Sequence, residues 1–281
     1  MNKGINPILK WAGGKRQLLK EIKKYIPEHF KVYHEPFLGG GAVLLDLQPQ
    51  NAIVNDSNEE LINVYRVIKD DVDKLIESLR HHSNEYERDS KNYFYKIREL
   101  DRDKETYNSL SAIERASRII FLNKTCYNGL FRVNRAGQFN TPFGRYKKPN
   151  IVNEKALISV SEYLNKANIK LLCGDFEAAL KYVKKGDFVY MDPPYDPVSD
   201  TASFTGYDKG GFNKNEQIRL SQACHELNKK GVKFLLSNSA TNFILNLYKD
   251  YRIEIIQAKR VLNSRADKRG EIDEVLVMNF E

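Results

Sequence analysis

Residues 31–47 read KVYHEPFLGGGAVLLDL, and this stretch predicts a short strand, a glycine-rich turn and a helix in immediate succession. The turn is formed by Gly39, Gly40 and Gly41. Glycine permits positive φ and a close approach of the backbone to a ligand, so such turns line cofactor pockets at the carboxyl ends of α/β strands. A plain tight turn is the more frequent origin of this pattern, so the stretch alone indicates a fold and not yet a ligand.

The next predicted strand, residues 52–55, is followed by Asp56, and an acidic residue in this position can hold the hydroxyls of a ribose. The chain contains neither the G-x-x-x-x-G-K-[ST] pattern of a phosphate-binding loop nor the G-x-G-x-x-G spacing of a dinucleotide-binding fold. The glycine turn and Asp56 together favour a ligand that contains a nucleoside but no pyrophosphate.

The alternation of strand and helix continues in the second half of the chain. Strands are predicted at residues 169–173, 188–191, 232–236, 253–257 and 275–280, with a helix at 214–229. Between the halves, residues 58–122 have helical spacing interrupted by the polar segment 80–91, and residues 126–149 are rich in Gly, Asn and Pro, as in a hairpin with loops. The sequence therefore predicts an α/β doubly wound sheet whose halves are separated by an insert of roughly a hundred residues.

The composition excludes several classes of protein. Of the 281 residues, 41% are hydrophobic and 29% are charged, which is typical of a globular chain and not of a disordered one. No apolar run approaches the roughly 18 residues of a membrane helix, and we expect no secretory signal. The three cysteines, at long spacings, form neither a disulfide framework nor a zinc site, which indicates a reducing cytoplasm.

Positive charge is concentrated in one stretch of the insert. The chain has 45 Lys and Arg against 37 Asp and Glu, and residues 124–148 contain no acidic residue. This stretch interleaves cations with aromatic residues, namely Lys124, Arg132, Arg135, Arg145, Lys147 and Lys148 with Tyr127, Phe131, Phe139, Phe143 and Tyr146. A solvated face is the ordinary origin of a charge run, but this mixture also suits contact with nucleic acid.

The sequence Asp192-Pro193-Pro194-Tyr195 follows the apolar strand at 188–191. Each proline fixes φ, and the first also restricts its neighbour, so the backbone here is stiff. That stiffness can hold the Asp192 carboxylate and the Pro193 carbonyl as two convergent acceptors, while Tyr195 offers a face on which a flat heterocycle can stack. A rigid turn at the end of a strand is the purely structural alternative.

Two convergent acceptors suit one particular reaction. The exocyclic amino group of a base is a poor nucleophile because its lone pair is delocalised into the ring. Acceptors aimed at its N–H bonds favour the pyramidal geometry in which the lone pair can attack, and they act more strongly in a dry pocket than in water. The motif therefore favours attack by a base amine on an electrophilic methyl group.

Taken together, the motifs resemble those of the S-adenosylmethionine-dependent DNA adenine-N6 methyltransferases. Asp-Pro-Pro-Tyr and Glu-Pro-Phe-x-Gly-Gly-Gly are joined by Lys10-Trp11-Ala12-Gly13-Gly14-Lys15, Gly174-Asp175-Phe176 and Leu236-Ser237-Asn238-Ser239. The insert lies between the glycine motif and Asp-Pro-Pro-Tyr, which is the alpha-group motif order of the Dam-like enzymes. Residues 127–132, YNGLFR, and 138–147, QFNTPFGRYK, are most similar to the members that recognise GATC.

The resemblance implies a fold and an activity. It implies a Rossmann-like S-adenosylmethionine methyltransferase sheet built from residues 1–57 and 167–281, with an inserted helical and hairpin DNA-recognition domain at 58–166 whose hairpin spans about 126–148. The enzyme would transfer a methyl group to N6 of adenine in double-stranded DNA, at the A of GATC, by base flipping. S-adenosylhomocysteine would be the product, and no metal is expected.

The resemblance also implies a setting. We expect a monomer without membrane association, acting in a bacterial cytoplasm or nucleoid or in a phage-infected cell. A cognate restriction endonuclease that recognises the same site would be a functional partner and not a physical one.

The resemblance assigns catalytic and cofactor-binding roles to residues of the motifs quoted above. Catalysis would rest on Asp192, Pro193, Pro194 and Tyr195. The methionine portion of the cofactor would contact Trp11 and Lys15, and Phe37, Gly39 and Gly41 would lie beneath the cofactor. Its ribose would contact Asp56, and its adenine would contact Asp175 and Phe176. Asp192 would lie where the cofactor meets the target base.

The implied DNA contacts come from the insert and from Lys10. Tyr127 and Asn128 would fill the gap left by the flipped base, Lys10 would read a guanine, and the base edges would be faced by Leu130, Arg132 and Pro142. Arg145 and Lys147 are expected to contact phosphates, which receive most hydrogen bonds in such interfaces. Phe131 has no assigned reading role, and it could simply pack the hairpin onto the helices together with Leu130.

Several alternatives remain at this level. A cytosine-N4 methyltransferase would use the same amine chemistry, although Ser more often stands in place of Asp192 in that group. RNA or protein-glutamine methyltransferases typically carry Asn there and lack this insert. A cytosine-C5 enzyme is excluded, because it needs a nucleophilic Cys, usually after Pro, whereas these cysteines follow Thr125, Leu172 and Ala223. A catalytically silent DNA-binding protein of the same fold is a further alternative.

Overall fold

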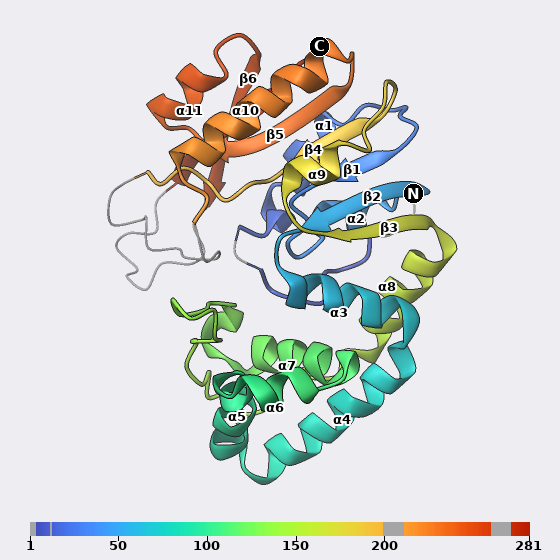
Figure 1. Ribbon diagram of the computed structural model, residues 1–281, viewed down its shortest axis with the longest axis vertical. Helices are drawn as coiled ribbons and strands as arrows, with labels where there is room; N and C mark the ends of the chain where they lie inside the picture. The colour runs from blue at the N-terminus through green and yellow to red at the C-terminus, as the bar shows by residue number, and fades with distance from the viewer. Residues whose placement is uncertain (1–3, 12, 199–210, 260–270) are drawn as a thin grey trace.

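The computed structural model describes residues 4–11, 13–198, 211–259 and 271–281, and is built around one seven-stranded sheet (Figure 1). The strands are β1 (Tyr33–Glu35), β2 (Asn51–Asp56), β3 (Asn168–Cys173), β4 (Phe188–Met191), β5 (Lys233–Ser239), β6 (Arg252–Lys259) and β7 (Glu271–Met278). Their order across the sheet is β3-β2-β1-β4-β5-β7-β6. None of the helices in these described ranges is long and apolar enough to cross a membrane.

The sheet has the predicted doubly wound arrangement. Strands β1 to β5 are parallel, and β7 inserts antiparallel between β5 and β6. The chain order reverses between β1 and β4, which pair with each other. In such sheets ligands bind outside the carboxyl ends of the strands at this switch point. Both Glu35, at the end of β1, and Asp192, directly after β4, therefore lie where a ligand site is expected.

Two apolar layers cover the sheet. Strand β4 is fully buried, as expected for a parallel strand covered on both faces. Its alternate side chains join different layers: Phe188 and Tyr190 pack in one, Val189 and Met191 in the other. The first layer contains α1 (Leu19–Lys24), α2 (Ala42–Leu47), α3 (Glu59–Asp70) and α8 (Glu154–Lys166), and the second contains α9 (Phe176–Leu180), α10 (Lys214–Lys229) and α11 (Asn242–Leu247).

The insert adds four further helices, which Figure 1 shows gathered below α3. They are α4 (Val72–Arg88), α5 (Ser90–Glu99), α6 (Lys104–Ser109) and α7 (Ala112–Thr125). Helix α3 contacts α7 on one side and β2 and β3 on the other. The apolar layer that begins under the sheet therefore continues into the insert without interruption.

The predicted helical stretch 58–122 is interrupted within the expected polar segment 80–91, but only near the end of that segment, and also at points that were not expected. The polar segment from residue 80 onward continues α4 as far as Arg88, because the helix buries Leu79, His82 and Tyr86 on one face. The break comes at Asp89, whose carboxylate caps α5 by accepting from the backbone N–H of Asn92. Further breaks are also set by capping residues, including the capping box of Ser111 and Glu114 at α7.

The Gly- and Asn-rich segment after α7 is a hairpin held by isolated pairs instead of regular strands. Cys126 pairs with Phe143, and Val133 pairs with Phe139, both antiparallel. Single 3-10 turns complete the described elements: η1 (Lys15–Gln17), η2 (Leu100–Arg102) and η3 (Tyr127–Gly129).

Candidate active site

The Lys15 ammonium forms an ion pair with the carboxylate that follows β4. Its Nζ lies 2.8 Å from Asp192 Oδ1, and it also donates to the Gly13 carbonyl at 2.8 Å. Lys15 is 5% exposed and Asp192 is 19% exposed, so the pair lies in a largely dry environment. Ala12, another residue of the N-terminal motif, lies outside the described residues.

The environment of Asp192 combines burial with stabilising partners. Ser237 Oγ donates to Asp192 Oδ1 at 3.1 Å. Burial raises the pKa of Asp192, while Lys15 and Ser237 oppose that rise. Ser237 belongs to the Leu236–Ser239 motif, and the structure places its hydroxyl directly on the acceptor that the sequence singled out.

Tyr195 is fixed at both its ring and its hydroxyl. Its Oη donates to Glu274 Oε2 at 2.7 Å, and Lys15 Nζ lies 4.5 Å from the ring centroid, within range of a cation–π contact. Glu274 lies on β7, paired with Ser239 of β5. Sequence reasoning missed Glu274, whose only visible signal is an acidic side chain directly before the apolar run 275–278.

The turn after β4 is held by side chains as well as by its two prolines. Gln217 Nε2 donates to the Pro194 carbonyl at 2.9 Å, and the Asp196 N–H donates to Asn238 Oδ1 at 3.1 Å. Asn238 and Gln217 are themselves joined, with Nδ2 to Oε1 at 3.0 Å. Pro193 is buried and Pro194 is exposed. The rigidity inferred from the prolines is thus reinforced by a buried amide network that the sequence did not reveal.

The glycine turn is tied to Asp56 and covered by Trp11. The Gly39 N–H donates to Asp56 Oδ2 at 2.8 Å. A Cβ on Gly39 would lie 3.1 Å from Trp11 Cδ1, so the indole packs directly on the turn. Gly41 has φ +65, and its Cβ would lie 2.6 Å from the Tyr65 hydroxyl, so both backbone conformation and space require glycine there.

The ends of three strands are drawn together by one buried amide. Asn55 Nδ2 donates to the Pro36 carbonyl at 3.0 Å and to the Gly174 carbonyl at 2.9 Å. These contacts join the loops that follow β1 and β3. The sequence places Asn55 only at the end of a strand, and nothing in the pattern identified this bridging role.

The same loops carry an aromatic cluster. Phe37 and Phe176 have ring centroids 5.3 Å apart, and Phe212, which sequence reasoning missed, lies 5.6 Å from Phe37. Asp175 caps α9 by accepting from the Glu177 N–H at 2.9 Å, and its carboxylate is also ion-paired with Arg219. The cluster offers flat apolar surface beside an exposed carboxylate.

The backbone of Lys10 is hydrogen-bonded to Asn123 of the insert. Asn123 Oδ1 accepts from the Lys10 N–H at 2.9 Å, and Asn123 Nδ2 donates to the Lys10 carbonyl at 2.8 Å. A Cβ on Gly129 would lie 2.7 Å from Lys10 Cδ, so the exposed Lys10 side chain runs across the turn η3. Within that turn Tyr127 is 54% exposed and Asn128 has a left-handed backbone.

The remaining predicted contact residues lie along the hairpin. Arg132 is exposed and donates to the Asn140 carbonyl at 3.0 Å. The exposed Pro142 accepts from the Tyr127 N–H at 2.8 Å, which brings the two ends of the hairpin together. Leu130 is half-buried.

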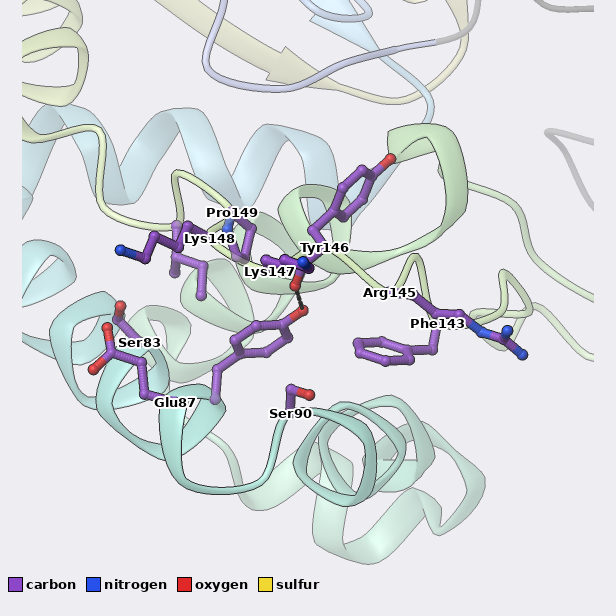
Figure 2. A pocket seen from close by; sticks show the side chains of 11 residues that line it. Ser83, Glu87, Ser90, Phe143, Arg145, Tyr146, Lys147, Lys148 and Pro149 are labelled. Atoms are coloured by element: carbon purple, nitrogen blue, oxygen red, sulfur yellow. Dashed lines mark hydrogen bonds between the residues drawn. The ribbon is translucent and has the colours of Figure 1, made fainter.

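Arg145 and Lys147, which the sequence assigned to phosphate contacts, line a pocket. This pocket of about 730 Å³ lies between α4, α5 and residues 143–151 (Figure 2). Tyr86, which also lines this pocket, donates from its Oη to the Tyr146 carbonyl at 2.7 Å, and this hydrogen bond is the dashed line in Figure 2. Its lining contains no residue of the Asp192 site.

Comparison with known proteins agrees with this geometry. A sequence model of the D12 class of N6 adenine-specific DNA methyltransferases matches residues 11–262. The chain belongs to this family. The prediction of an adenine-specific DNA methyltransferase is thereby confirmed, and the cytosine-N4 alternative is overturned.

Relatives of this D12-class methyltransferase match along nearly its whole length. It is 46% identical over 276 residues to the Type II methyltransferase M1.LlaDCHI of Lactococcus lactis subsp. cremoris, covering 98% of this chain and 96% of the relative. It is 45% identical over 291 residues to the Type II methyltransferase M.MjaIII of Methanocaldococcus jannaschii, covering 98% and 99%. It is 33% identical over 270 residues to the DNA adenine methylase of Escherichia coli K12, covering 96% and 94%.

The cofactor of this methyltransferase is S-adenosylmethionine, and the residues present fit it. An acidic side chain beside a tight glycine turn suits a ribose, and the Phe37–Phe176 cluster suits a flat adenine. Lys15 has three N–H donors, of which two meet Gly13 and Asp192, so one remains for a carboxylate. The substrate of the D12 class is DNA.

Proposed function

We propose that this methyltransferase modifies the adenine of GATC in double-stranded DNA after that adenine has rotated out of the duplex. The observation that carries the proposal is the position of Lys10. The Lys10 side chain lies across Gly129 of the turn η3. Lys15, in the same N-terminal motif, contacts Asp192. The N-terminal segment from Lys10 to Lys15 therefore connects the residues assigned to sequence reading with those assigned to catalysis.

Asp192 is proposed to accept a hydrogen bond from the amino group of the flipped adenine. Lys15 and Ser237 both contact the Oδ1 atom of Asp192, so neither of these two contacts uses Oδ2. Together with the Pro193 carbonyl, it would favour a pyramidal N6. Bound S-adenosylmethionine supplies an electrophilic methyl group. In the transfer, the bond from the methyl carbon to sulfur would break as the bond to N6 forms, with S-adenosylhomocysteine as the leaving group. N6 would then carry positive charge, which the Asp192 carboxylate would stabilise until one N6 proton is lost to solvent.

Tyr195 is proposed to hold the adenine ring by stacking. Lys15 lies over one face of the Tyr195 ring, so the base would occupy the other face. The hydrogen bond to Glu274 fixes the plane of that ring before the base arrives. Stacking and the Asp192 acceptor would offset the few kcal/mol that flipping costs.

Sequence reading is proposed to rest on the hairpin. The exposed Arg132 guanidinium can donate to O6 and N7 of a guanine in the major groove, the commonest specific contact by geometry. The exposed Tyr127 ring, with Asn128, would fill the space left by the flipped adenine. We propose that residues 58–166 form the recognition domain, although α3 and α8 within this range also pack on the sheet.

The similarity to Type II methyltransferases supports a role beside a restriction endonuclease. In that role, methylation would protect host GATC sites from cleavage by an enzyme that recognises the same sequence. We propose that the methyltransferase acts as a monomer, because one chain carries both the recognition hairpin and the catalytic turn. We also propose that it acts in the cytoplasm.

The test is methyl transfer from labelled S-adenosylmethionine to three duplexes. One carries GATC, one a scrambled site, and one GATC with N6-methyladenine already in both strands. Label on the first duplex alone, recovered as N6-methyladenine, is the expected result. Equal label on the scrambled duplex would overturn the assigned sequence, and label on the premethylated duplex would overturn the assigned base.

A further inference from the structure

The Trp11 indole is stacked against a residue of the recognition hairpin. The ring centroids of Trp11 and Phe131 are 4.8 Å apart with an interplanar angle of 22°. Phe131 is 5% exposed and stands in the chain between Leu130 and Arg132. Trp11 and Phe131 come from segments far apart in the sequence, so the contact directly links the N-terminal cofactor motif to the reader.

Trp11 also contacts the glycine turn. A Cβ on Gly40 would lie 3.3 Å from Trp11 Cβ, and one on Gly39 would lie 3.1 Å from Trp11 Cδ1. The turn is tied in turn to Asp56 through the Gly39 N–H. The indole is therefore in contact with the proposed cofactor loop and with the hairpin at the same time.

Both neighbours of the indole are firmly held. The backbone of Lys10, next to Trp11, is clamped by Asn123 through two hydrogen bonds of 2.9 and 2.8 Å. On the other side, Phe131 packs edge-to-face on Phe139, with centroids 5.7 Å apart, and the Phe139 N–H donates to Asp101 Oδ2 at 2.7 Å. Because the backbone beside Trp11 and the ring of Phe131 are both attached to the insert, a change in the orientation of the indole acts directly on Phe131.

We propose that Phe131 is a positioning residue that couples cofactor binding to DNA binding through its stack on Trp11. A cofactor that settles on the glycine turn would set the orientation of the Trp11 indole, and the stack would pass that orientation through Phe131 to the backbone on which Leu130 and Arg132 stand. Coupling between two sites is reciprocal, so DNA on the hairpin must strengthen cofactor binding by the same factor. The inference rests on the proposed function, because that function assigns the cofactor to the turn and DNA to the hairpin.

The test measures this linkage directly. The dissociation constant of S-adenosylhomocysteine is determined by titration calorimetry for the full chain, alone and with a duplex. The duplex is whichever one the wild-type protein methylates, so an error in the assigned GATC sequence changes the probe and not the test. We expect the duplex to tighten binding by a factor of about five or more in the wild-type protein.

Three variants separate coupling from general loosening of the insert. Phe131→Leu removes the ring and should bring the ratio of the two dissociation constants close to one. Phe131→Tyr retains the ring and should keep the wild-type ratio. Phe121→Leu is the matched control, since Phe121 is also buried in the insert but packs on His82, Tyr86 and Tyr93.

The proposal is overturned by any of three results. These are an unchanged ratio in Phe131→Leu, an equal loss of the ratio in Phe121→Leu, or no effect of the duplex in the wild-type protein.

Discussion

The Lys15 ammonium and the Asp192 carboxylate lie 2.8 Å apart although they come from opposite halves of the chain. Lys15 also covers one face of Tyr195, so a single cation orders two residues of the Asp192–Tyr195 motif. The charge pair keeps the carboxylate available as an acceptor in a setting where burial alone would favour its protonated form. This relationship is the basis of the proposed chemistry.

Asp192→Ala should abolish methyl transfer while leaving the fold intact. Loss of one preorganised electrostatic group in an active site typically lowers the rate by a factor on the order of 100 to 1,000, and Asp192 is the group proposed to contact the reacting nitrogen. The rate is measured with labelled S-adenosylmethionine, and circular dichroism verifies the fold. Ser237→Ala serves as a comparison that keeps the carboxylate and should lose less. A folded Asp192→Ala protein with wild-type activity would contradict the mechanism.

Glu274→Gln should change how stability depends on pH. Burial raises the pKa of Glu274 above its ordinary value of 4.5, so the folded state favours the protonated form. Glu274 therefore supports stability fully below pH 4.5 and loses that contribution as pH rises through the raised pKa.

We accordingly expect the free energy of unfolding of Glu274→Gln, relative to wild type, to increase from about pH 4 to about pH 7. Urea unfolding at both pH values measures this difference. A relative stability that falls over the same range would show that Glu274 is better stabilised as the anion.

Arg132→Ala should relax specificity at one position of the recognition site. A bidentate contact between arginine and guanine is worth about 1–3 kcal/mol of discrimination. The measurement compares kcat/KM for the cognate duplex with kcat/KM for duplexes changed at each base. The exposed Arg135 in the same hairpin provides the control Arg135→Ala. If Arg132→Ala instead weakens activity on all duplexes equally, Arg132 contacts a phosphate.

Gly41→Ala should destabilise the glycine turn for two separable reasons. The left-handed backbone costs an L-residue about 1–2 kcal/mol, and the new methyl group would meet the Tyr65 hydroxyl. The double variant Gly41→Ala with Tyr65→Phe removes the second cost and leaves the first. Urea unfolding of both single variants and the double variant gives the interaction energy. Strict additivity would contradict the close contact between the methyl position and Tyr65.

Much of the framework was predictable from local pattern. The continuous apolar run 188–191, the glycine turn and the acidic residue at the end of β2 each follow from the residues themselves, and the parallel sheet brings the carboxyl ends of these strands to one edge. The break in this helical stretch falls inside the predicted segment 80–91, but most of that segment is helical because amphipathic spacing outweighs a polar composition. The helix continues as long as one face remains buried, and it ends at a capping residue.

The contacts that refine the site were not predictable in the same way. Glu274 reaches Tyr195 only because β7 inserts antiparallel beside β5 in one particular register. Gln217 reaches the Pro194 carbonyl from α10, and Phe131 meets Trp11 across the boundary between insert and sheet. Each contact joins segments whose relative placement is a property of the whole fold, and no spacing within either segment encodes it.

The most direct test of the central proposal is a map of every methylated adenine in a plasmid. Unmethylated plasmid DNA is treated to completion with the purified enzyme and S-adenosylmethionine, and N6-methyladenine is located by sequencing that detects the modified base in single molecules. We expect N6-methyladenine in both strands of every GATC and at no other adenine. Methylation confined to a different sequence, or spread over adenines without regard to sequence, would contradict the proposal.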